Sequence, residues 1–85
     1  MFKIGDKMNL NNNVKVAFKK LGAHIKFLRT ERNISLEELS KYTNIRKEYL
    51  KKIEDGNAYG VMIERHLIKI AKAFGIQLCE LVDYE

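Results

Sequence analysis

The 85-residue sequence contains one cysteine, no proline and no tryptophan. A single cysteine excludes an internal disulfide and a cysteine-rich metal site. No apolar run approaches the roughly 18 residues that a membrane helix needs, and the mixed, polar start MFKIGDKMNLNNN predicts no signal peptide. These absences, with the short length, exclude a disulfide-linked secreted mini-protein, an integral membrane protein and a large-cored enzyme. They favour a small cytoplasmic binding module.

Charge is unevenly distributed along the chain, whose net charge is +5. Residues 1–33 carry eight basic and two acidic side chains, residues 34–55 carry five of each, and residues 56–85 carry three basic and four acidic ones. A basic front half favours a polyanionic partner such as a nucleic acid. A solvated, lysine-rich surface is an equally good interpretation of the charge alone.

Hydrophobic spacing predicts helices throughout residues 13–85, after a flexible arm over residues 1–12. Asn13 is placed to cap the first helix, which we expect to end near Arg32. Steps of three and four place these apolar residues on one face of that helix: Val14, Phe18, Leu21, Ile25 and Leu28. Further helices are expected over about 36–42, 46–55, 63–74 and 77–82. No alternating pattern indicates a strand, so the sequence predicts an all-α domain of five helices.

Polar residues and glycine at the expected helix ends predict how the chain turns. Ser35 and Glu38 have the three-residue spacing of a capping box. Asn33 and Asn44 tolerate the positive φ that a helix end or a tight turn needs. Gly56 is placed as the C-cap of the third helix.

The second and third expected helices have the layout of a pair that crosses steeply through a short turn. Ser40 is small where the two helices must approach, and Asn44 supplies the turn. The third helix is expected to direct Tyr49, Leu50 and Ile53 inward. It exposes four cations and one anion: Arg46, Lys47, Glu48, Lys51 and Lys52. A protruding helix with this charge matches the dimensions and potential of a DNA major groove.

These residues resemble a known family. SLEELS at residues 35–40 and IEDG at residues 53–56 are similar to the helix-turn-helix of the Cro/C1-type (Xre family) bacterial and phage repressors, and the similarity extends over about 21–81. It implies a five-helix, lambda-repressor-like domain that binds double-stranded DNA, usually as a homodimer on a palindromic operator, and acts in transcription regulation. It also implies a structural ion pair between Arg29 and Glu54.

The resemblance assigns the DNA-binding candidates residue by residue. Lys47 and Glu48 match the main base-contacting positions, where a lysine can donate to guanine and a glutamate can accept from cytosine N4. The remaining candidates are Arg46 at the helix start, Lys51 and Lys52 one turn further on, and Asn57 as a phosphate contact. The alternative is that the cations touch only phosphates. Leu36 departs from the family pattern, because many members carry there a glutamine that clamps a phosphate.

A second resemblance keeps a different function open. Residues 35–54 are similar to the cytoplasmic domain of the bacterial cell-shape protein RodZ, which uses the same fold to bind the filament protein MreB. The alternative is therefore a protein-interaction module, of this kind or as an antitoxin that binds a toxin.

Residues that could support other chemistry are isolated in the sequence. His24 and His66 have no neighbours at metal-ligand spacing, and no nucleophile–base pair can be identified. We expect neither a metal, a cofactor nor an enzymatic activity, and we expect Cys79 to be a half-buried small hydrophobe.

Overall fold

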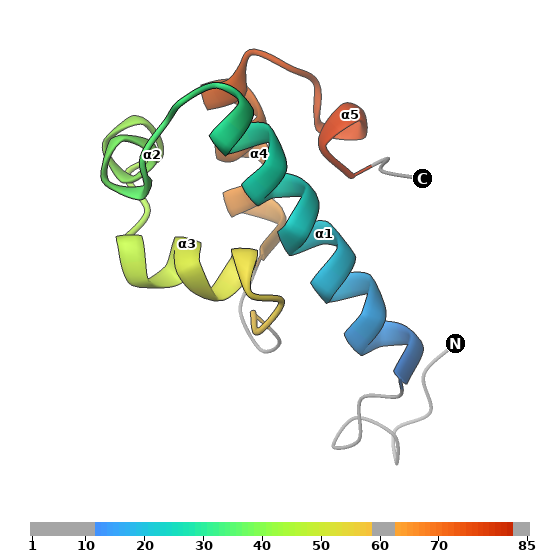
Figure 1. Cartoon of the computed structure of the whole chain (residues 1–85). Helices are drawn as coiled ribbons and strands as arrows, with labels where there is room; N and C mark the ends of the chain where they lie inside the picture. The colour runs from blue at the N-terminus through green and yellow to red at the C-terminus, as the bar shows by residue number, and fades with distance from the viewer. Residues whose placement is uncertain (1–11, 59–62, 83–85) are drawn as a thin grey trace.

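The computed structural model describes residues 12–58 and 63–82, and within these ranges the chain forms helices and no strand (Figure 1). The helices are α1 (Asn12–Glu31), α2 (Leu36–Thr43), α3 (Lys47–Glu54), α4 (Ile63–Phe74) and α5 (Leu78–Val82). This is the predicted all-α, five-helix architecture of the Cro/C1 type. Asn13 lies inside α1 instead of capping it, because α1 begins at Asn12, the last residue of the expected arm. Residues 1–11 of that arm lie outside the described residues.

The core lies between the five helices, which pack in pairs: α1 on α3 and α5, α2 on α3 and α4, and α4 on α5. Ile25 of α1, Leu39 of α2, Leu50 of α3 and Ile70 of α4 are each no more than 1% exposed. The other buried apolar residues are Ile45, Ile53, Ala58, Leu67, Ala71, Phe74 and Leu81. Apolar residues from all five helices thus share one core, and burying each large side chain contributes about 1.5–3 kcal/mol.

Helix α1 passes directly over the C-terminal end of α3 at Gly22. A Cβ atom on Gly22 would lie 2.7 Å from the carbonyl carbon of Glu54 and would overlap the carbonyl oxygens of Ile53 and Glu54. Any side chain at this position would therefore force the two helices apart. The close approach of α1 to α3 therefore depends on a glycine at position 22, which has no side chain.

Local signals define the ends of α1 and α2 as predicted. Asn33 has φ of 56°, the left-handed conformation that ends α1. The Ser35 hydroxyl accepts from the Glu38 amide at 3.0 Å, and the Glu38 carboxylate accepts from the Ser35 amide at 2.8 Å. This reciprocal capping box satisfies two backbone donors at the start of α2.

Side-chain hydrogen bonds fix the turn between α2 and α3. Asn44 has φ of 59°, and its amide donates to Ser40 O at 2.8 Å. The Ser40 hydroxyl donates to Ile45 O at 2.6 Å, and the buried Thr43 hydroxyl donates to Leu39 O at 2.7 Å. The turn is therefore specified by hydroxyl groups and by one residue that tolerates positive φ.

Three further features differ from the sequence prediction. The C-cap of α3 is Asp55, and Gly56 follows it in the left-handed conformation with φ of 78°. Tyr49 is 40% exposed instead of inward, because it lies on the flank of α3 between the buried and solvent-facing sides. Cys79 is exposed, because α5 buries Leu81 instead.

In the part of the chain that the structure describes, no helix is long and apolar enough to span a membrane.

Replacing Gly22 tests the close approach of α1 and α3. Helix propensity alone predicts that Gly22→Ala stabilises the protein by about 1 kcal/mol. The overlap with the α3 carbonyl groups predicts the opposite sign, a loss of about 1–3 kcal/mol in the free energy of unfolding, measured by urea denaturation. The matched control is Ala23→Gly at the exposed neighbouring position, which should cost about 0.5–1 kcal/mol through propensity. A Gly22→Ala variant as stable as the unaltered protein would contradict the overlap.

Candidate nucleic-acid interface

A buried ion pair fixes α3 against the rest of the molecule. Arg29 Nε donates to Glu54 Oε2 at 2.6 Å, and Arg29 Nη2 donates to Glu54 Oε1 at 3.1 Å. Arg29 Nη1 donates to Ile34 O at 2.8 Å. The two side chains are 11% and 5% exposed. One guanidinium group thus joins α1, the start of the α2 segment and the end of α3 in bidentate geometry. The structure places the two residues together as the sequence analysis expected.

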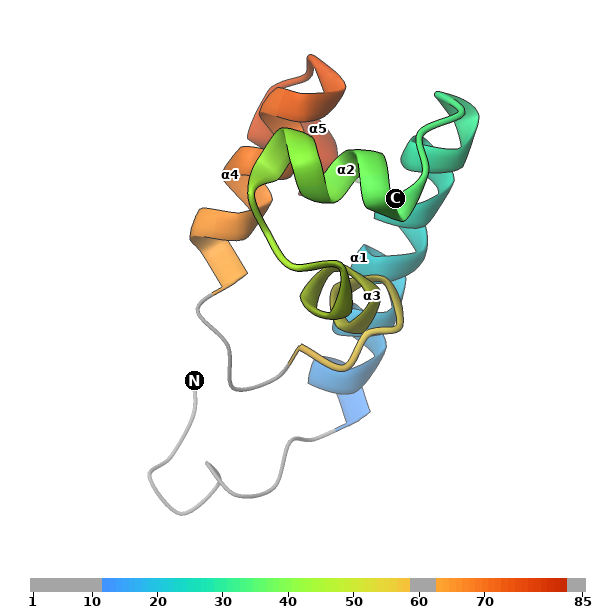
Figure 2. The same cartoon turned by 90° about the vertical axis from the view of Figure 1, so that its left-hand side faces the viewer.

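The outer side of α3 protrudes from the domain. Helix α2 is seen end-on in Figure 1 and side-on in Figure 2, and α3 the reverse, so the two helices cross steeply. The exposed residues on α3 and its flanks include all six DNA-binding candidates: Arg46, Lys47, Glu48, Lys51, Lys52 and Asn57. An α-helix with its side chains is about 10–12 Å in diameter, which is close to the roughly 12 Å width of the major groove.

The cations of this face fall into two groups. Lys47 Nζ donates to Glu37 Oε2 of α2 at 3.0 Å, and Lys51 Nζ lies 3.7 Å from Asp55 Oδ2 on its own helix. Arg46 and Lys52 have no acidic partner among the residues that the structure describes. The Lys47 ammonium also holds the pKa of the exposed Glu37 carboxyl below its usual range, first through the hydrogen bond and then through charge. Glu37 is therefore ionised at neutral pH.

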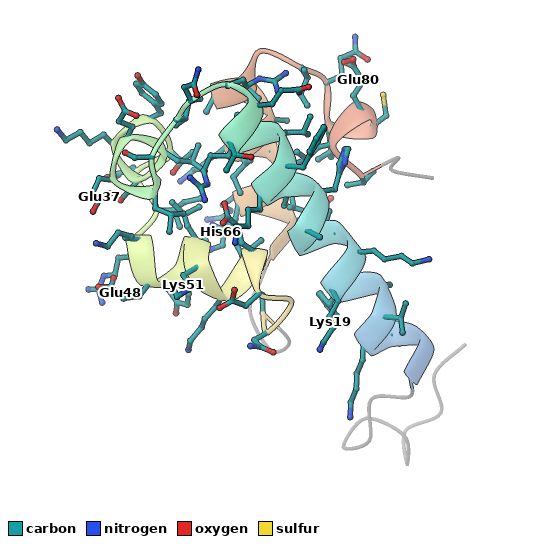
Figure 3. All side chains as sticks on the ribbon, viewed as in Figure 1. Lys19, Glu37, Glu48, Lys51, His66 and Glu80 are labelled. Atoms are coloured by element: carbon teal, nitrogen blue, oxygen red, sulfur yellow. The ribbon has the colours of Figure 1, made fainter. Side chains whose placement is uncertain are left out.

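Tyr49 adds an aromatic surface to the interface. It lines an open hollow together with Arg46, Glu48 and Lys52. Its ring centroid lies 6.0 Å from that of His66 on α4, with the rings tilted by 37°, and His66 is labelled just above α3 in Figure 3. The His66 Nδ1 atom is buried without a hydrogen-bond partner in the described structure. Tyr49 therefore bridges the core contact with α4 and the solvent-facing side of α3.

Lys19 extends the cationic surface from α3 onto α1. A Cβ on Gly56 would lie 2.8 Å from both Cα and Cγ of Lys19, so this lysine packs over the turn that ends α3. Figure 3 shows Lys19 on the part of α1 that faces this turn. The ammonium of Lys19 is therefore available on the same side as the exposed Asn57.

Sequence reasoning missed three residues of this surface: Lys19, Glu37 and Tyr49. Lys19 and Gly56 are remote in the chain, and their proximity results from the packing of α1 on α3. Glu37 and Lys47 lie on different helices, so no helical spacing predicts their contact. The exposure of Tyr49 depends on how tertiary packing rotates α3 about its axis, so no spacing in the sequence predicts it.

The interface offers hydrogen-bonding groups of both charges. Among the described residues, no group of three or more His, Cys, Asp or Glu side chains could hold a metal ion. Its groups are ammonium, guanidinium, carboxylate, phenol and amide, which are hydrogen-bonding groups suited to phosphate and base edges.

Removing Glu54 tests the ion pair that positions α3. Glu54→Ala leaves Arg29 charged and mostly buried, so we expect a loss of about 3 kcal/mol in the free energy of unfolding. Asp55→Ala removes an exposed carboxylate one residue later and should change stability by no more than about 0.5 kcal/mol. In urea denaturation, equal effects of the two substitutions would contradict the structural role of Glu54.

The chain matches one family model. The model describes a helix-turn-helix domain, and the match covers residues 22–84. It therefore begins in the middle of α1, at the glycine that contacts α3, and includes α2, α3, α4 and α5. None of the curated proteins compared with the chain matches it.

Proposed function

The chain belongs to the helix-turn-helix domain family, and from that premise we propose that it is a sequence-specific DNA-binding transcriptional regulator. The observation that carries this proposal is the exposed outer side of α3, held on a rigid core by the Arg29–Glu54 pair. Base discrimination requires donors and acceptors at fixed positions, and a helix anchored at its C-terminal end provides them.

In this proposal α3 enters the major groove with its N-terminal residues facing the base pairs. Lys47 donates to guanine O6 or N7, and Glu48 accepts from cytosine N4. Both side chains are exposed on the first turn of α3, which supports this assignment. Tyr49 offers apolar contact to a thymine methyl group from the edge of the same surface.

The phosphate contacts surround the helix in the groove. Arg46 and Lys52, which have no acidic partner in the described structure, supply charge for the DNA backbone beside α3. Lys51 adds a further cation once it leaves Asp55, at 3.7 Å in the free protein. Asn57 and Lys19 contact the phosphates beyond the C-terminal end of α3.

We further propose that two copies bind together on a palindromic operator. A single α3 contacts few base pairs, whereas two copies related by a two-fold axis contact half-sites about 34 Å apart. The exposed apolar residues Ile68 of α4 and Val82 of α5, away from α3, support a contact between copies. Four further apolar residues that the sequence offers for a contact between copies, Tyr59, Val61, Met62 and Tyr84, lie outside the described residues.

Selection of bound duplexes from a random-sequence pool tests the proposed function. We expect enrichment of a palindromic sequence that survives an increase from low to near-physiological salt. Binding without enrichment, lost as salt rises, would mean general attraction to phosphates. That result would contradict the proposal and favour a protein partner for the α3 surface, as in a filament-binding or toxin-binding module.

Repeating the selection with the Lys47→Ala variant tests whether Lys47 contacts a base. If Lys47 contacts a base, the preference at one position of each half-site should fall by about 1–3 kcal/mol, with the other positions unchanged. Lys52→Ala is the matched control on the same helix. It should weaken binding to all sequences alike and flatten the salt dependence by about one counterion. An unchanged preference in Lys47→Ala would contradict the base contact.

A further inference from the structure

The contact between Glu37 and Lys47 joins the two helices of the helix-turn-helix at the edge of the proposed DNA surface. Lys47 is the first residue of α3, Glu37 is the second residue of α2, and Lys47 Nζ lies 3.0 Å from Glu37 Oε2. Figure 3 shows Glu37 at the side of α2 that faces the start of α3, near Glu48. In the described parts of the chain, this pair and Arg29–Glu54 are the two ion pairs between different helices.

The contact with Glu37 restrains the Lys47 ammonium but uses only one of its three hydrogen-bond donors. A lysine ammonium has three donors on a four-carbon side chain that rotates freely in water. Glu37 accepts one of these donors, and the other two have no acceptor within the described structure. Because the Lys47 and Glu37 side chains are 48% and 67% exposed, the free donors are accessible to a ligand. The pair therefore presents two oriented donors to the solvent.

The Glu37 carboxylate also reduces the electrostatic attraction between Lys47 and the DNA phosphates. Glu37 is ionised at neutral pH, as an exposed glutamate ordinarily is, and the hydrogen bond from Lys47 lowers its pKa further. At the distance of a neighbouring phosphate, the paired charges largely cancel, so Lys47 attracts the DNA backbone less than an unpaired lysine does. Hydrogen bonds act at short range and are unaffected by this cancellation. Lys52, with no acidic partner among the described residues, provides the contrasting case on the same helix.

We propose that Glu37 is a positioning residue that determines specificity: it orients Lys47 toward a base edge and offsets its attraction to phosphates. The inference rests on the proposed function, because it requires α3 in the major groove. Lys47 and Glu37, which lie on different helices, would together discriminate one base pair. Lys47 would contact the base, and Glu37 would not contact the DNA itself.

Glu37→Gln tests this role, with Glu80→Gln as the matched control. Both substitutions remove one negative charge, and Glu80 lies on α5, far from Glu37 in Figure 3. The glutamine at position 80 keeps an oxygen that can accept from the Gln77 amide, as Glu80 does at 3.2 Å. Each variant is titrated with the selected duplex, with duplexes changed at single positions and with an unrelated duplex, at several salt concentrations. Thermal unfolding checks that both variants are folded.

We expect Glu37→Gln to strengthen binding to the unrelated duplex by about two- to fivefold and to steepen the salt dependence by about one counterion. At the position that Lys47→Ala affects, we expect the preference to fall from on the order of tenfold toward the value of Lys47→Ala. Glu80→Gln should leave all three quantities unchanged.

A Glu37→Gln variant that binds every duplex more tightly but keeps its full preference at that position would overturn the proposal, because Glu37 would then act through repulsion alone. The outcomes also separate the two proposals. If the unaltered chain prefers no sequence, both fail. If it prefers one and Glu37→Gln retains that preference, the role of Glu37 fails and the proposed function remains.

Discussion

The bidentate ion pair between Arg29 and Glu54 is the interaction on which the position of α3 depends. An isolated helix of eight residues is not stable in water, so α3 takes its structure and orientation from its contacts. Gly22 lets α1 approach the carbonyl groups at the end of α3, and Arg29 joins that end to α1 and to the segment before α2. The core residues Leu50 and Ile53 fix the remaining rotation of α3 about its axis. The outer side of α3 is therefore presented in one orientation.

This constraint explains how a segment with no net charge can present a DNA interface. Residues 34–55 carry equal numbers of basic and acidic side chains, so their total charge does not attract DNA. The arrangement of the charges supplies the function instead: Lys47 is paired across to α2, whereas Arg46 and Lys52 have no acidic partner in the described structure. A flexible helix could not maintain that distinction. Fixing α3 thus separates the proposed base contacts from the proposed phosphate contacts.

The features that the sequence predicted are those decided by neighbouring residues. The capping box at Ser35, the left-handed residues Asn33 and Asn44, and the helical periodicity of the core depend on spacings of a few residues. The ion pair between Arg29 and Glu54 was predicted from a family resemblance and not from the spacing of residues. The contacts of Lys19 with Gly56 and of Glu37 with Lys47 could not be predicted, because they arise where separate helices cross. The exposure of Tyr49 depends on the rotation of α3, which tertiary packing determines.

The proposed function requires that the outer side of α3, held by its buried end, contacts DNA. Backbone amide chemical shifts of the isotope-labelled protein, followed by NMR during titration with the selected duplex, locate the contact surface. We expect changes concentrated on α3, the first turn of α2 and the turn at Gly56 and Asn57, with the amides of α5 unchanged. Changes confined to the exposed side of α1 around Phe27, with α3 unaffected, would contradict the proposed function.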